Sequence, residues 1–195
     1  MKVLGRRTVW LGAAVVAMLA AAGLAPASAK QRVDSFAGSC SFQGTVAFSP
    51  PATNTQQLLK VVYDANGTCD GTLDGRQVSG APVEMHNEAT ADGSCLRADT
   101  IEPGHGAMEF ADGTVIAYSL EFHYVGTDGV QTFQGERSGS ALGHGSFLTQ
   151  RTPPDTALKC AGEGAAEVPM DLSLTTQSPL ESDGQPGAKR GGRRY

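Results

Sequence analysis

After residue 30, apolar and polar residues alternate with a period of two, which is typical of β-strands that bury one face. The clearest example spans residues 115–125. The apolar face of this segment consists of Ile116, Tyr118, Leu120, Phe122 and Tyr124. We expect a strand whose apolar face packs the core. Turn dipeptides at 112–113 and 128–129 place this strand at the centre of a meander.

The same alternation recurs in short segments separated by tight-turn dipeptides. Asn-Gly or Asp-Gly pairs occur at 66–67, 74–75, 92–93, 112–113 and 128–129. Gly adopts the positive φ of such turns without steric cost. The predicted strands are 40–48, 58–64, 68–74, 83–88, 94–101, 108–111, 115–125, 130–137, 140–148 and 167–175. This spacing predicts an all-β fold, a single antiparallel β-barrel or β-sandwich of about 8–10 short strands, and we prefer the barrel.

The first 29 residues have a different pattern, that of a secretory signal peptide. A basic start with Lys2, Arg6 and Arg7 precedes an apolar, Ala-rich stretch, and 27–29 is the small-residue motif that a signal peptidase cuts after. We therefore expect a secreted, extracytoplasmic bacterial protein whose mature chain starts at Lys30. The paired arginines leave a twin-arginine route open, but we prefer the general secretory route. No later apolar stretch reaches the ~20 residues of a transmembrane helix.

Charge divides the mature chain into a body and a tail. Residues 30–180 contain 8 Lys and Arg against 18 Asp and Glu, a net charge of −10. We expect this range to be one β-domain, and its acidity argues against nucleic acid as a partner. Residues 181–195 contain 4 basic and 2 acidic residues and almost nothing apolar, so we predict a disordered basic tail.

All four cysteines lie in the mature chain, and an even number in an oxidising compartment predicts two disulfides. If the strands around Cys40 and Cys69 form a hairpin in which paired residue numbers sum to about 109, then Val46 faces Tyr63 and Cys40 faces Cys69. We prefer this pairing, which leaves Cys95 with Cys160 and anchors the long loop 150–165. The alternative pairing joins Cys69 to Cys95 and Cys40 to Cys160.

Alternate acidic residues and histidines on two predicted strands are the strongest candidate for chemistry. Alternate residues of a strand share a face, so side-by-side strands would bring five oxygen and nitrogen donors together. The five residues are Glu84, His86, Glu88, Glu121 and His123. Such donors suit Zn²⁺ or another divalent ion. The competing interpretation, which we favour, is that this face is simply exposed to solvent; we predict no cofactor.

Glycines at 135, 139, 143 and 145 suggest either a shallow glycan-binding groove or relief of crowding where a barrel bends. We favour relief of crowding.

No catalytic signature is present, so we expect a non-enzymatic extracellular or cell-envelope binding module. Its partner would be a small molecule held in the barrel mouth, or an envelope glycan or protein. The alternative is a metal-dependent extracellular enzyme that uses the five residues above.

Overall fold

A computed structural model describes residues 33–147 and 149–183. The predicted signal peptide lies outside these residues, as does the predicted tail from residue 184 onward. The described part of the chain consists of nine strands and one short helix. These are β1 (Val33–Ala52), β2 (Gln57–Leu73), β3 (Arg76–Ser94), β4 (Arg97–Thr100), β5 (Gly104–Phe110), β6 (Val115–Val125), β7 (Asp128–Gly135), β8 (Ser138–Ser146), α1 (Thr156–Ala161) and β9 (Ala165–Asp183).

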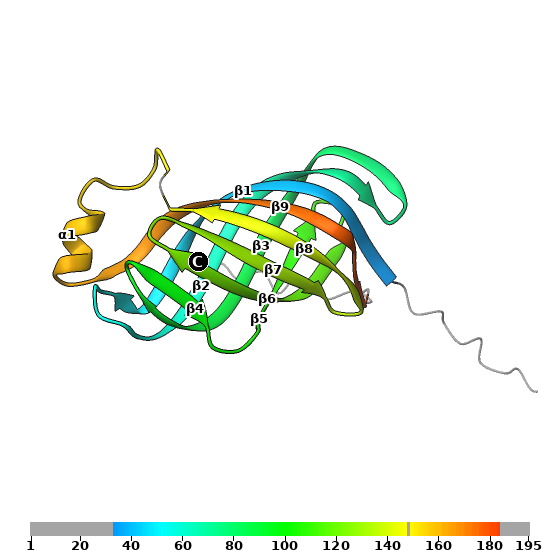
Figure 1. Cartoon of the computed structure of the whole chain (residues 1–195). Coiled ribbons are helices and arrows are strands. Elements are labelled where there is room, and N and C mark those ends of the chain that lie inside the picture. Colours follow the sequence, from blue (N-terminus) through cyan, green and yellow to red (C-terminus); the bar gives the residue numbers. More distant parts are fainter. Residues whose placement is uncertain (1–32, 148, 184–195) are drawn as a thin grey trace, which may run out of the picture. The chain divides into compact units, whose positions relative to one another are not determined.

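The strands form one antiparallel sheet that closes into a barrel (Figure 1). Apart from β4 and β5, strands that follow one another in the sequence pair with each other, and β9 pairs with both β8 and β1, which closes the ring. The short strands β4 and β5 share one position, because both lie between β3 and β6. The prediction of a barrel is therefore confirmed. Closure joins the last strand to the first, so the described sheet has no terminal strand.

The pairing of β1 with β2 has the predicted register. Cys40 lies opposite Cys69 and Val46 lies opposite Tyr63. Cys40 and Cys69 form a disulfide across this pair, and Cys95 and Cys160 form the second one. The preferred disulfide pairing is thus the one in the structure.

The alternation of β6 is also confirmed, since its apolar face points into the barrel. Ile116, Tyr118 and Leu120 are at most 3 % exposed, whereas Glu121 and His123 face solvent. β6 pairs with β5 and β7, its neighbours along the chain, as expected for the centre of a meander.

Several strands are longer than the sequence pattern predicted. β9 reaches Asp183, three residues beyond the boundary placed at 180, because Leu180 and Ser182 are buried and Glu181 pairs with Ser138. Ser182 and Asp183 continue β9 because they pair with the start of β1, and residue polarity alone does not reveal this. The helix α1, a single short element in the loop before β9, was not predicted.

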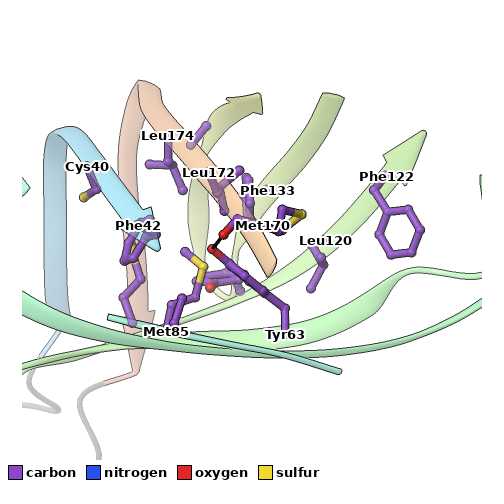
Figure 2. Close-up of a cluster of buried hydrophobic side chains, with 14 of the residues drawn as sticks. Cys40, Phe42, Tyr63, Met85, Leu120, Phe122, Phe133, Met170, Leu172 and Leu174 are labelled. Carbon is purple, nitrogen blue, oxygen red and sulfur yellow. Dashed lines mark hydrogen bonds between the residues drawn. The ribbon is translucent and has the colours of Figure 1, made fainter. Parts of the chain in front are cut away.

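The barrel interior is densely packed in one half, which we call the filled half. Figure 2 shows Phe42, Met85, Phe133 and Leu174 gathered there, while Phe122 stands apart. Aromatic rings pack against one another, as in the pair Tyr118–Phe133, whose centroids are 5.1 Å apart. The largest fully buried side chains in this half are Phe36, Phe42, Phe110, Phe133, Met108, Ile116, Leu172, Leu174 and Leu180.

Candidate functional site

The other half of the barrel, which we call the hollow half, contains a cavity of about 540 Å³. It opens at the end of the barrel where α1 lies (Figure 1). The apolar side chains on its wall include Val46, Phe48, Val61, Ala89, Ala98, Leu120, Phe122, Phe147, Val168 and Met170. The interior of a barrel of about eight strands can either be filled by side chains or leave room for one small ligand. This barrel is filled in one half and hollow in the other.

Small inward-facing residues create this space. Ala52, Ala89, Ala98 and Ala165 lie near the strand ends at the mouth and line the cavity. Ala52, Ala89 and Ala165 are buried although their methyl groups fill little volume. Many inward positions in the filled half carry larger side chains such as Phe110, Met108 and Leu174, so the sequence leaves the hollow half underfilled.

A hydrogen-bonded pair on β6 and β7 supplies polar groups to the cavity wall. Gln131 Nε2 donates to Tyr124 Oη at 2.6 Å, and Tyr124 Oη donates to Met170 Sδ at 3.2 Å. Gln131 is only 3 % exposed, and its Oε1 has no hydrogen-bond partner among the described residues. Burial raises the pKa of Tyr124 to about 12, so its hydroxyl is neutral at physiological pH.

A second polar group at the cavity wall is centred on Asn87 of β3. Asn87 Oδ1 accepts from Tyr118 Oη at 2.8 Å. Among the described residues, Nδ2 has one hydrogen-bond partner, the weak acceptor Met85 Sδ at 3.5 Å. Tyr63, which lies opposite Asn87, donates to the Met170 backbone oxygen at 3.4 Å (Figure 2). Burial raises the pKa of Tyr63 as well, so this hydroxyl too is neutral.

The mouth of the cavity is bordered by residues 149–164, which we call the mouth segment. Pro153, Pro154 and Thr156 of this segment line the cavity. The disulfide Cys95–Cys160 fastens the segment to the end of β3, and the Asn54 backbone N–H donates to the Cys160 backbone oxygen at 3.1 Å. The expected anchoring of this loop by Cys160 is confirmed.

Charge is nearly absent from the cavity wall. Among the described residues that line it, Arg97 is the only one with a permanently charged side chain, and it lies near the mouth. Its Nε lies 2.6 Å from Asp99 Oδ2, so the guanidinium is already paired. The inner wall therefore offers neutral donors and acceptors in an apolar setting, which suits an uncharged ligand.

The predicted metal ligands lie on the outer face of the barrel. On β3, His86 Nδ1 lies 2.6 Å from Asp64 Oδ1, and His86 Nε2 lies 3.3 Å from Glu88 Oε1. Glu88 also pairs with Lys60 at 3.0 Å. Glu84 borders the same outer surface as His86.

On β6, His123 Nδ1 pairs with Asp99 of β4, and Glu121 is exposed on the same face of the strand. The five predicted metal ligands thus belong to two separate groups of side chains.

The structure does not bring these two groups together. β5 separates β3 from β6 at His86, which pairs with Ala107, and Ala107 pairs with Ala117. His123 lies six residues further along β6, about 20 Å at 3.3 Å per residue. Within residues 33–147 and 149–183, no group of three or more His, Cys, Asp or Glu side chains is arranged to hold a metal ion. A metal shared by all five stays a prediction that this geometry does not support.

The glycines of β8 make room for cavity side chains. A Cβ on Gly145 would overlap Tyr124 Oη, and a Cβ on Gly143 would lie 2.8 Å from the Phe133 ring. Both glycines are buried rather than open to an outer groove. This arrangement supports relief of crowding over a glycan groove.

Sequence reasoning missed the polar residues of the cavity. Asn87 and Gln131 occupy positions of the alternation whose neighbours on the same face are apolar, such as Met85 and Phe133. A polar residue on an otherwise apolar strand face is the signal that could have identified them, because buried polar groups need partners.

The comparisons with known proteins identify no relative. No family model matches the chain, and no curated protein or solved structure shows significant similarity to it. No helix within the described ranges is long and apolar enough to cross a membrane.

Proposed function

We propose that this protein is an extracytoplasmic binding protein that holds one small, largely apolar molecule inside its barrel. The observation that carries this proposal is the cavity of about 540 Å³ in the hollow half. Ligand sites typically measure about 300–1,000 Å³ and combine an apolar wall with a few polar groups that fix orientation. The wall residues around Gln131, Tyr124 and Asn87 have this composition.

The chemistry of the wall supports binding rather than catalysis. General acid–base catalysis most often uses His, Asp, Glu or Lys. The described residues that line the cavity include none of these, and both lining cysteines are joined in a disulfide. The tyrosine hydroxyls are neutral, so the groups available to a ligand are hydrogen-bond donors and acceptors.

The proposed compartment agrees with the cysteine chemistry. Disulfides persist outside the reducing cytoplasm, and every described cysteine is in one. The signal peptide predicted for residues 1–29 supports the same location. A ligand captured there would be an extracellular or envelope small molecule.

A fluorescent probe tests binding in the cavity directly. N-phenyl-1-naphthylamine, a neutral apolar dye, should bind the mature protein with a stoichiometry of about one and gain fluorescence. Ala89→Phe places a ring in the cavity, because Ala89 faces inward and is buried, and should abolish the signal.

The matched control is Ala117→Phe, the same substitution on the outward face of β6. This variant should bind the dye as the wild type does. Absence of saturable binding by the folded wild type, or equal binding by both variants, would refute the cavity as the site.

A further inference from the structure

The buried amide of Gln131 indicates the chemistry of the ligand end that enters the barrel first. Building on the binding function proposed above, we infer that this end carries a neutral hydroxyl or N–H group and donates a hydrogen bond to Gln131 Oε1. The rest of the ligand is apolar and lies toward the mouth.

The first observation is an acceptor without a donor. Gln131 is 97 % removed from solvent, and Oε1 has no hydrogen-bond partner among the described residues. Nearly all buried polar groups in folded proteins are hydrogen-bonded, because leaving one unpaired is costly. Gln131 lines the cavity, but Oε1 is itself buried, so a ligand would supply the missing donor once the side chain turns toward the cavity.

The second observation is the orientation of the Gln131 amide relative to Tyr124. Tyr124 Oη gives its one hydrogen to Met170 Sδ at 3.2 Å, so its oxygen accepts from Gln131 Nε2 at 2.6 Å. One amide N–H is therefore paired with Tyr124, whereas the amide oxygen has no partner among the described residues. This favours a ligand donor over a ligand acceptor.

The third observation is the absence of a counter-charge. Leu120, Phe122 and Met170 surround this part of the wall, and no described lining residue is an Asp or Glu. An ammonium group would be a buried unpaired charge, which is far more costly than a buried hydroxyl. The donor is therefore neutral, as in an alcohol, a phenol or an amide N–H.

Three probes of similar shape test the inference: 2-naphthol, which donates; 2-methoxynaphthalene, which can only accept; and naphthalene, which does neither. Their affinities would be measured by calorimetry at pH 7, where 2-naphthol is neutral. The wild type should bind 2-naphthol about tenfold more tightly than 2-methoxynaphthalene, a ratio that corresponds to about 1.4 kcal/mol.

The variant Gln131→Met replaces the amide by an apolar chain of similar length. It should reduce the 2-naphthol preference to about one while binding naphthalene at least as well as the wild type. Gln134→Met is the matched control, because Gln134 lies on the same strand but is exposed on the outer face. This control should keep the tenfold preference.

Two outcomes overturn the inference: equal affinity of the wild type for the donor and acceptor probes, or a preference that persists in Gln131→Met. If no probe binds the folded wild type, the proposed function itself fails, which is a distinct result. Should Gln131→Met not fold, the wild type suffices. Its Gln131 side-chain amide NMR signals should shift more with 2-naphthol than with 2-methoxynaphthalene, and equal shifts would contradict the inference.

Discussion

The two halves of the barrel use the same strands for opposite purposes. In the filled half, rings such as Phe42 and Phe133 occupy the interior completely, with almost no exposed surface. In the hollow half, alanines such as Ala89 and Ala98 leave about 540 Å³ unfilled. Close packing stabilises a fold through many small contacts. The comparison indicates that the filled half supplies the stability that allows the hollow half to stay open.

A matched pair of leucine substitutions should show the largest difference between the halves. Leu174→Ala in the filled half should lower the free energy of unfolding by about 3–5 kcal/mol, because it leaves a cavity among fully buried neighbours. Leu120→Ala at the cavity wall should cost at least about 1 kcal/mol less, since its side chain already borders empty space and loses fewer contacts. Urea denaturation followed by circular dichroism measures both values.

The m-value serves as the control for this pair, because an unchanged m-value shows that each variant unfolds the same structure. Equal costs for the two leucines would mean that the hollow half is packed as tightly as the filled half, which would contradict the comparison. Saturating N-phenyl-1-naphthylamine should stabilise the Leu174→Ala variant, whose cavity wall is intact, as it does the wild type.

Removal of either disulfide should lower the free energy of unfolding. The order of the two losses should be opposite to the order that their loop lengths predict. They span 29 residues for Cys40–Cys69 and 65 residues for Cys95–Cys160. Loop entropy alone gives about 3.6 and about 4.3 kcal/mol. The double variant Cys95→Ala with Cys160→Ala should nevertheless cost less than Cys40→Ala with Cys69→Ala. The mouth segment can detach while the barrel stays folded, because α1 has no buried residue.

The two disulfides should also differ in their effect on the dissociation rate of the bound dye, which stopped-flow fluorescence measures. Loss of Cys95–Cys160 should speed dissociation severalfold, because the mouth segment borders the cavity. Loss of Cys40–Cys69, a bridge between β1 and β2, should leave the dissociation rate unchanged. A faster release in the second variant and not in the first would reverse the roles assigned to the two halves.

The sequence predicted some local features of the fold correctly and others wrongly. The turns expected at 66–67, 92–93 and 128–129 are wrong, because these dipeptides lie within β2, β3 and β7. The register of β1 with β2 followed from the position of two cysteines and of two apolar residues, and the buried face of β6 followed from strict alternation. These are properties of one strand or of one adjacent pair, so neighbouring residues determine them.

The cavity could not be predicted in this way. Whether Ala89 of β3 and Ala165 of β9 face the same interior space depends on closure of the ring and on the stagger of all its strands. The pairing of Gln131 with Tyr124 depends on the same geometry. The five acidic and histidine residues were placed on correct strand faces, but their separation across β4 and β5 required the strand order.

The smallest expected effect is that of pH on the free energy of unfolding. This effect should come from groups on the outer surface and not from groups in the barrel interior. Cavity tyrosines have raised pKa values, so they stay protonated in both folded and unfolded chains well below pH 10. The difference between the Leu174→Ala and Leu120→Ala variants should therefore be constant from pH 6 to pH 9.

The outer-face residue His86 should behave differently. A hydrogen bond to Asp64 raises its pKa above the ordinary value of 6.5, so the folded chain binds this proton more tightly than the unfolded chain does. The contribution of protonated His86 to the free energy of unfolding is fully present below pH 6.5 and is lost as the pH rises through the folded-state pKa of His86. Asp64→Asn should lower the His86 pKa in an NMR titration. It should also reduce stability slightly at pH 5.5 and not at pH 9, within the roughly 0.2–1 kcal/mol of an exposed ion pair.

If the difference in stability between Leu174→Ala and Leu120→Ala varied with pH while the His86 pKa stayed ordinary, the titrating group would lie inside the barrel. The hollow half would then not be the neutral site that the proposed ligand requires.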